Sequence, residues 1–230
     1  ASTMYLLTQL MRIGTILYLM ALTLNAVFGW DIALVIAVTG IVVMIYSTLG
    51  GIQAVVWTDA IQAIILITGA VVCMLYIFVN MPEGPGQVFD IAIENQKFSL
   101  GSFVLDLSQP TFWVVLVYGI FINLQNYGVD QNYVQRYMIA KTEKDAQKAA
   151  FWGGMLYVPV SLLFLFIGSA LFAYYESGAA FLPIELQDAT KADRVFPYFI
   201  VNQLPAGLTG LLIASIFAAG MSTISTSFNS

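Results

Sequence analysis

The sequence of 230 residues is rich in hydrophobic residues (60%) and poor in charged ones (9%), with a mean hydropathy of +0.85. Since soluble domains carry about a quarter charged residues, this composition excludes an ordinary water-soluble domain. The net charge is −5 and no basic patch is present, which argues against nucleic-acid binding. With no His and only Cys73, the composition argues against a zinc or haem site.

Long uncharged stretches recur along the chain, and a helix needs about 20 apolar residues to cross a bilayer. We therefore expect an all-α, polytopic protein of the cell membrane, embedded in lipid as a single transmembrane domain over residues 1–230. The expected membrane helices span residues 5–28, 31–49, 53–80, 110–138, 151–175 and 205–230. The sequence begins and ends inside a helical pattern, so we expect an internal fragment of a longer protein.

The first expected helix, residues 5–28, carries Arg12 about two turns from its start. The planar guanidinium could bind a carboxylate through two hydrogen bonds. Alternatively, the long side chain could extend to the membrane interface and place its charge in water. Both interpretations remain open from the sequence.

The third expected helix, residues 53–80, contains Asp59, with Thr58 beside it and Gln62 one turn on. A charge at the centre of a membrane helix costs about 2.5–3.5 kcal/mol on insertion scales, so an acid there indicates function. No Lys or Arg lies within seven residues on either side. The carboxylate is therefore predicted to bind a cation, the alternative being simple hydration at the cytoplasmic end of the helix.

The positions of Lys and Arg predict which side of the membrane each connection faces. Connections 81–109 and 176–204 hold many of the acids and few basic residues, so we place them outside and expect a short surface helix over 87–96. The side expected in the cytoplasm collects Arg12, Arg136, Lys141, Lys144 and Lys148.

The fourth expected helix, residues 110–138, contains a polar cluster that suits hydrogen bonding and stacking against a polyhydroxylated solute. The cluster consists of Asn123, Gln125, Asn126 and Tyr127. Asp130 and Arg136 follow it, and we interpret them as structural charges at the cytoplasmic end, paired with each other or with neighbours.

The last expected helix ends with five hydroxyl residues within positions 222–227. One helical face combines Ala219, Ser222, Thr223 and Thr226, with Ser225 alongside. Hydroxyl and carbonyl oxygens are ligands for hard cations, which favours an ion site. The alternative is that this small-residue face packs against another helix.

Three segments together resemble the sodium/solute symporter family, in family order and spacing. They are Tyr46–Gln62, with Gly-Gly and Thr-Asp pairs, Asp130–Lys141, with Val-Gln-Arg, and the segment Leu204–Ser230. The resemblance implies two inverted five-helix repeats, of which this chain supplies core helices three to eight. It also implies sodium-coupled symport of a small polar solute by alternating access, and not an enzyme.

The resemblance also implies ion-binding residues. Ala219, through its carbonyl, and the hydroxyls of Ser222 and Thr223 match the eighth-helix half of the family's main sodium site. The missing first core helix would supply the other half. Members with a second sodium site use an Asp and nearby hydroxyls, which Asp59, Ser222, Ser225 and Thr226 match.

For the solute, Asn123 matches a sugar-contacting Asn of galactose-type members, but two positions differ from them. Asn126 replaces their inner-gate Tyr, although Tyr127 is adjacent, and Met155 replaces a sugar-contacting Lys. Arg12 instead matches the Arg that binds the substrate carboxylate in sialic-acid-type members. The resemblance therefore favours a sugar acid such as sialic acid.

Two other classes remain open from the sequence. A proton-coupled symporter of the same fold would use Asp59 as its proton carrier, and a sensor would join this membrane fold to a signalling domain. A membrane enzyme is disfavoured because the sequence offers no combination of nucleophile, base and metal ligands.

Overall fold

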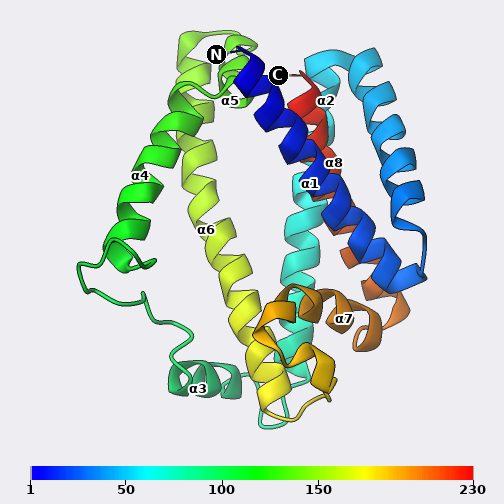
Figure 1. Ribbon diagram of the computed structural model, residues 1–230, viewed down its shortest axis with the longest axis vertical. Coiled ribbons are helices and arrows are strands. Elements are labelled where there is room, and N and C mark those ends of the chain that lie inside the picture. Colours follow the sequence, from blue (N-terminus) through cyan, green and yellow to red (C-terminus); the bar gives the residue numbers. More distant parts are fainter. Residues whose placement is uncertain (1, 230) are drawn as a thin grey trace.

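The computed structural model describes residues 2–229, with side chains described except at positions 2, 26–27, 50–54, 189 and 229. Ser230, the last residue of the final predicted helix, therefore lies outside the described residues. The described part of the chain is all-helical (Figure 1). Its elements are α1 (Ser2–Phe28), α2 (Ile32–Val79), α3 (Gln87–Glu94), α4 (Phe112–Gly128), α5 (Gln131–Met138), α6 (Glu143–Glu176), the 3₁₀ helices η1 (Ile184–Leu186) and η2 (Ala189–Arg194), α7 (Val195–Asn202) and α8 (Ala206–Asn229).

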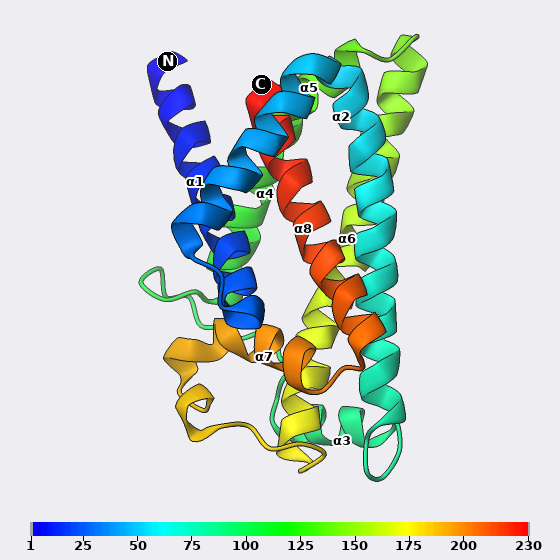
Figure 2. The same cartoon turned by 90° about the vertical axis from the view of Figure 1, so that its right-hand side faces the viewer.

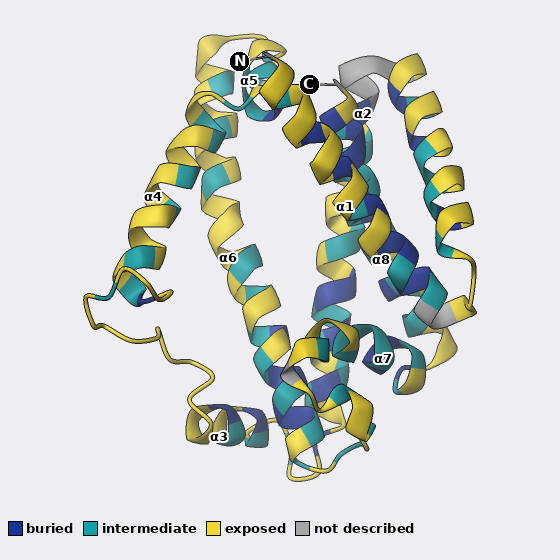
Figure 3. Ribbon diagram, viewed as in Figure 1, coloured by how far each residue is buried: buried dark blue, intermediate teal, exposed yellow. Residues whose placement is uncertain are grey.

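The helices have the length and composition of a multi-pass membrane protein, as predicted. Five segments of the described chain are long and apolar enough to cross a bilayer, and the bent pair α4–α5 would make a sixth span. Many large apolar side chains are exposed, among them Trp57 (74%) and Leu165 (71%). Figure 3 shows exposed positions along the length of the long helices. A surface of this kind is stable against lipid and not against water.

The second and third predicted helices, 31–49 and 53–80, form one continuous helical element, α2. Figures 1 and 2 show that α2 reverses direction at one end of the molecule, so its two halves run antiparallel. These halves, Ile32–Leu49 and Val55–Val79, are separate candidate spans. The helical backbone continues through the reversal instead of ending in a loop.

The fourth predicted helix, 110–138, is broken in the structure. Helices α4 and α5 are bent by 42° at the break between them. Asp130 lies in the break with extended backbone angles, and its side chain accepts a hydrogen bond from the backbone N–H of Asn132 (2.8 Å). An Asp in this position stabilises the start of a helix, which explains why α5 begins anew there.

Helix α6 begins eight positions before the start of the predicted helix 151–175. Its N-cap is Thr142, whose hydroxyl oxygen accepts a hydrogen bond from the N–H of Asp145 (3.2 Å). Glu143 and Asp145 occupy the first turn, where negative charge favours the helix dipole. The charged residues that suggested a loop therefore form the first turns of α6.

The two long connections lie at the same end of the molecule, as expected. Figures 1 and 2 show α3 and α7 at the end opposite to α5 and to the reversal of α2. Helix α3 lies within the predicted surface helix 87–96, and Val88 and Ala92 on it are buried. The second connection is more ordered than predicted, since η1, η2 and α7 form within it and Phe199 and Ile200 of α7 are fully buried.

Helix α8 packs between the two halves of α2 and against α1 (Figure 2). Helix α8 approaches α2 closely at Gly69, where a Cβ atom would lie 2.3 Å from the Oγ atom of Ser215. Ser215 is 2% exposed and donates a hydrogen bond to the backbone carbonyl of Ile65 (3.1 Å). Small residues at this crossing allow α8 to approach α2 closely. The polar face of α8 can then contact the second half of α2.

This packing predicts that Gly69→Ala destabilises the full-length protein by about 1–3 kcal/mol, because overpacking forces neighbouring groups to move. We expect a lower apparent melting temperature in detergent. The matched control is Gly168→Ala in α6, where a Cβ atom would meet nothing within 4 Å. Adding Ser215→Ala to Gly69→Ala should recover part of the loss, and equal melting temperatures for the Gly69 and Gly168 variants would contradict the prediction.

Candidate functional site

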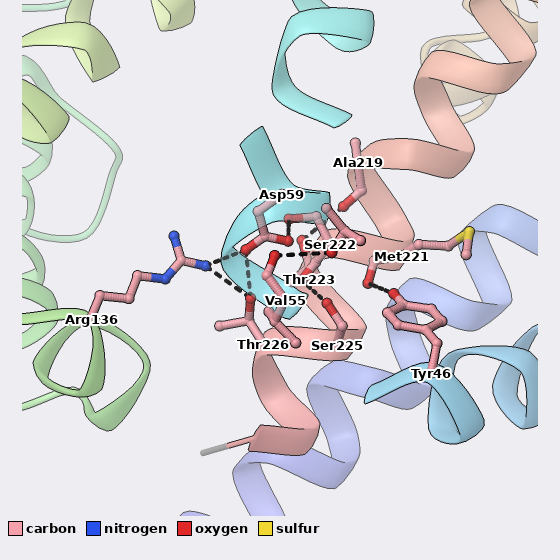
Figure 4. A network of polar contacts seen from close by, with 11 residues as sticks. Tyr46, Val55, Asp59, Arg136, Ala219, Met221, Ser222, Thr223, Ser225 and Thr226 are labelled. Carbon is pink, nitrogen blue, oxygen red and sulfur yellow. Dashed lines mark hydrogen bonds and ion pairs between the residues drawn. The ribbon is translucent and has the colours of Figure 1, made fainter. Parts of the chain in front are cut away.

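Asp59 lies in the second half of α2 with its carboxylate directed at α8 (Figure 4). Its Oδ1 atom accepts a hydrogen bond from Ser222 Oγ (2.6 Å), and its Oδ2 atom accepts one from Thr226 Oγ1 (3.2 Å). The side chain is 11% exposed. The structure thus joins the acid to the hydroxyl face of α8, and it disfavours the alternative in which Asp59 is simply hydrated.

A third contact to this carboxylate comes from Arg136 of α5. Its Nη2 atom lies 2.6 Å from Asp59 Oδ2 and donates a second hydrogen bond to Thr226 Oγ1 (3.0 Å). Arg136 was expected to pair with Asp130 or with neighbours; its partner in the structure is Asp59, while the Asp130 side chain caps α5. Arg136 is 77 positions from Asp59 in the sequence, far outside the seven residues on either side that contain no Lys or Arg.

The other predicted ion ligands on α8 are hydrogen-bonded within that helix. Thr223 Oγ1 donates to the carbonyl of Ala219 (3.0 Å), and Ser225 Oγ donates to the carbonyl of Ser222 (3.0 Å). Ser225 is fully buried. Of the set assigned to a second sodium site, Asp59, Ser222 and Thr226 are in direct contact, and Ser225 lies one turn from Ser222 and next to Thr226.

Tyr46, in the first half of α2, also supports this part of α8. Its hydroxyl donates a hydrogen bond to the carbonyl of Met221 (3.2 Å), one residue before Ser222 (Figure 4). The polar segment of α8 is therefore held from both halves of α2. Tyr46 was not among the predicted site residues, although it is the first residue of the segment Tyr46–Gln62 that carries the Gly-Gly pair.

Arg12 and the hydroxyl face of α8 border the same cavity of about 160 Å³. The described residues that line it are Arg12, Asn132, Tyr133, Arg136, Ser222, Thr223, Thr226 and Ser227. Two guanidinium groups and several hydroxyls therefore face one space. Groups of this kind hydrogen-bond well to carboxylate oxygens, so the cavity suits an anionic group of a solute beside the ion ligands.

The polar cluster of α4 does not reach that cavity in the described structure. Asn123 and Tyr127 line a separate pocket of about 500 Å³, and Asn123 donates to the carbonyl of Gly119 in its own helix (2.7 Å). Gln125 is exposed and Asn126 half-buried. Figure 1 shows α4 on the far side of α6 from α8. The structure therefore does not bring this cluster together with Arg12.

Comparison with known proteins shows which family the chain resembles. The sequence model of the Sodium:solute symporter family matches residues 1–230. The sodium/sialic acid symporters SiaT of Proteus mirabilis and NanT of Aliivibrio fischeri are 32% and 33% identical to the whole chain, which covers 46% and 45% of their lengths. The sodium-dependent multivitamin transporter of Oryctolagus cuniculus is 34% identical over 98% of the chain and 35% of its own length.

A solved structure with the same arrangement is that of a Na⁺-coupled sialic acid symporter in a substrate-bound outward-open state, described as revealing a novel Na⁺ site. It superposes with a TM-score of 0.91 at 32% identity, over 98% of this chain and 47% of that one. The chain thus spans a little under half the length of these sialic acid symporters. The relatives named are transporters and not enzymes. Because the family match extends over every residue, the chain belongs to the Sodium:solute symporter family.

Proposed function

We propose that the protein containing this chain is a sodium-coupled symporter, which carries a small polar solute by alternating access. The observation that supports this most directly is the contact of the Asp59 carboxylate with the hydroxyls of Ser222 and Thr226. Placing a carboxylate in a membrane-embedded helix costs free energy, so its presence indicates a functional site. Here it lies among oxygen atoms, which are the ligands that hard cations prefer.

A second sodium site would use Asp59 together with Ser222, Ser225 and Thr226. Such a donor set supplies one negative charge and three hydroxyl oxygens. The Ser225 hydroxyl, one residue before Thr226 on the same helix, donates a hydrogen bond to the carbonyl of Ser222 (3.0 Å). The site would therefore bind a monovalent ion without any His or Cys ligand.

The main sodium site would use the carbonyl of Ala219 with the hydroxyls of Ser222 and Thr223. Ser222 and Thr223 both line the cavity, and the Thr223 hydroxyl lies 3.0 Å from the carbonyl of Ala219. We propose that a helix outside this chain completes the coordination, as the family resemblance implies. Ser222 would then belong to both ion sites and couple their occupancy.

The solute is proposed to be a sugar or sugar acid, such as sialic acid, whose carboxylate binds Arg12. This assignment is supported by the position of Arg12 on the hydroxyl-lined cavity. It also agrees with SiaT and NanT, which are named as sialic acid symporters. Asn123, Gln125, Asn126 and Tyr127 stay predicted solute contacts, for which α4 would have to lie closer to the cavity.

Counterflow in liposomes containing the full-length protein tests this function. Sialic acid, glucose and proline are compared with and without Na⁺ at constant pH, and then under a pH gradient without Na⁺. We expect exchange of sialic acid that requires Na⁺. Exchange that depends on the pH gradient and is independent of Na⁺ would identify a proton-coupled symporter instead. Absence of exchange with all three solutes would overturn the solute assignment.

The shared role of Ser222 gives a graded prediction. Ser222→Ala should raise the Na⁺ concentration for half-maximal uptake more than Ser225→Ala, because Ser222 contributes to both proposed sites. Loss of a hydrogen bond to a charged group costs about 1.5–3 kcal/mol, so we expect roughly a tenfold or larger rise for Ser222→Ala. Sodium-titrated uptake measures both variants, and equal rises would contradict the double role.

A further inference from the structure

We propose that Arg136 is a tethered cation that exchanges places with sodium at Asp59. In this view the guanidinium holds the carboxylate when the ion is away, and it moves off when the ion binds. The proposal rests on the sodium-coupled function proposed above and assigns to α5 a role in ion binding and release.

The geometry places the guanidinium on the ion ligands themselves. Arg136 Nη2 contacts Asp59 Oδ2 (2.6 Å) and Thr226 Oγ1 (3.0 Å), and these two oxygens are 3.2 Å apart. Both belong to the proposed second sodium site. A sodium ion bound to both oxygens would lie against Nη2, so two positive charges would share one carboxylate oxygen. Since the shared carboxylate of Asp59 is only 11% exposed, their repulsion is only partly screened and favours one cation at a time.

Exchange of Arg136 for sodium would also keep the Asp59 carboxylate paired with a cation. The carboxylate of Asp59 is 11% exposed, and an isolated charge in such a place is strongly unfavourable. The charged side chains on or against the cavity in the described structure are Arg12, Arg136 and Asp59. If Arg136 replaces each departing ion, the carboxylate keeps a cation throughout the cycle. Return of the guanidinium would then assist release of sodium.

The position of Arg136 permits such movement. Its side chain is 43% exposed, in contrast to that of Asp59, so one side of it already meets the exterior. It is carried by α5, a helix of eight residues that follows the 42° bend after α4. A long side chain on a short helix next to a break can withdraw without disturbing the contacts of α2 with α8.

Equilibrium binding of radioactive Na⁺ to the purified full-length protein tests the exchange. Removing the competing charge with Arg136→Gln should tighten Na⁺ binding about tenfold and slow Na⁺ release, whereas Arg136→Lys should stay closer to the native protein. The matched control is Lys141→Gln, which removes the same charge from an exposed site on the same basic segment. It should leave Na⁺ affinity unchanged.

A double-mutant cycle shows whether the effect passes through Asp59. In an Asp59→Asn background, Arg136→Gln should no longer tighten Na⁺ binding. Weaker or unchanged binding in the Arg136→Gln single variant would overturn the exchange and leave sodium coupling intact. If the native protein binds no Na⁺ saturably, the proposed function fails, and the exchange fails with it.

A second measurement needs no substitution at Arg136. Hydrogen–deuterium exchange of a peptide covering α5 should rise at least about twofold when Na⁺ is added to the native full-length protein, because α5 loses its tether to α2 and α8. The same peptide should already exchange faster in Asp59→Asn without Na⁺. Slower or unchanged exchange of α5 on adding Na⁺ would overturn the proposal even if Arg136→Gln failed to fold.

Discussion

Asp59→Asn is expected to lower the Na⁺ affinity of the full-length protein at least about tenfold and to reduce the number of ions carried per solute from two to one. Asparagine keeps the shape of the side chain and can still accept a hydrogen bond from Ser222. It removes the negative charge that would compensate an ion among the hydroxyls of α8. The main sodium site does not include Asp59 and should remain.

The loss of one ion has a large effect on accumulation of an anionic solute. Two Na⁺ with a monovalent anion move one net positive charge, and 100 mV then contributes about 2.3 kcal/mol. This corresponds to roughly fifty-fold accumulation at equal Na⁺ concentrations. One Na⁺ with the same anion moves no net charge, so the variant should show no accumulation driven by the potential.

Proteoliposomes with a potassium-diffusion potential measure this difference directly. The matched control is Glu94→Gln, which removes an exposed acid at the end of α3, far from the ion ligands. Accumulation by the control should equal that of the native protein. A two-ion stoichiometry retained by Asp59→Asn would show that Asp59 is not an ion ligand.

Arg12→Gln is expected to reduce uptake of an acidic solute by about ten- to a hundredfold, while a neutral solute of the same family of compounds is spared. The reason is that a hydrogen bond to a charged group contributes about 1.5–3 kcal/mol, and a guanidinium offers two of them to one carboxylate. Competition uptake of sialic acid and of its methyl ester, which lacks the charge, distinguishes the two outcomes.

Two further variants separate charge from geometry at this position. Arg12→Lys keeps the charge but loses the planar fork, so its uptake of the acid should lie between Arg12→Gln and the native protein. Lys148→Gln removes a positive charge from an exposed site on α6 and should have no effect. Equal loss of acid and ester uptake in Arg12→Gln would indicate a structural role for Arg12 and would reject carboxylate binding.

Much of the fold could be predicted from the sequence because the bilayer imposes a local rule. A long, predominantly apolar stretch must be helical to satisfy its backbone hydrogen bonds in lipid, so 53–80 and 205–230 were recognisable without tertiary information. The errors lie where charged residues cap or start helices. The segment Glu143–Lys148 was left out of the predicted helix 151–175 although Thr142 caps α6 there, and the predicted helix 110–138 is two helices because Asp130 caps a new one.

The sequence by itself determined that the hydroxyls of residues 222–227 gather on one part of α8, since residues three and four apart share a helix face. It also determined that Asp59 needs a partner, since an unpaired acid in a membrane span is costly. Only the tertiary structure decided which residues contact Asp59 and the polar segment of α8. Arg136 and Ser222 are 77 and 163 positions from Asp59, and Tyr46 is 175 positions from Met221. Such contacts depend on how each helix is rotated and packed against the next, which no local pattern encodes.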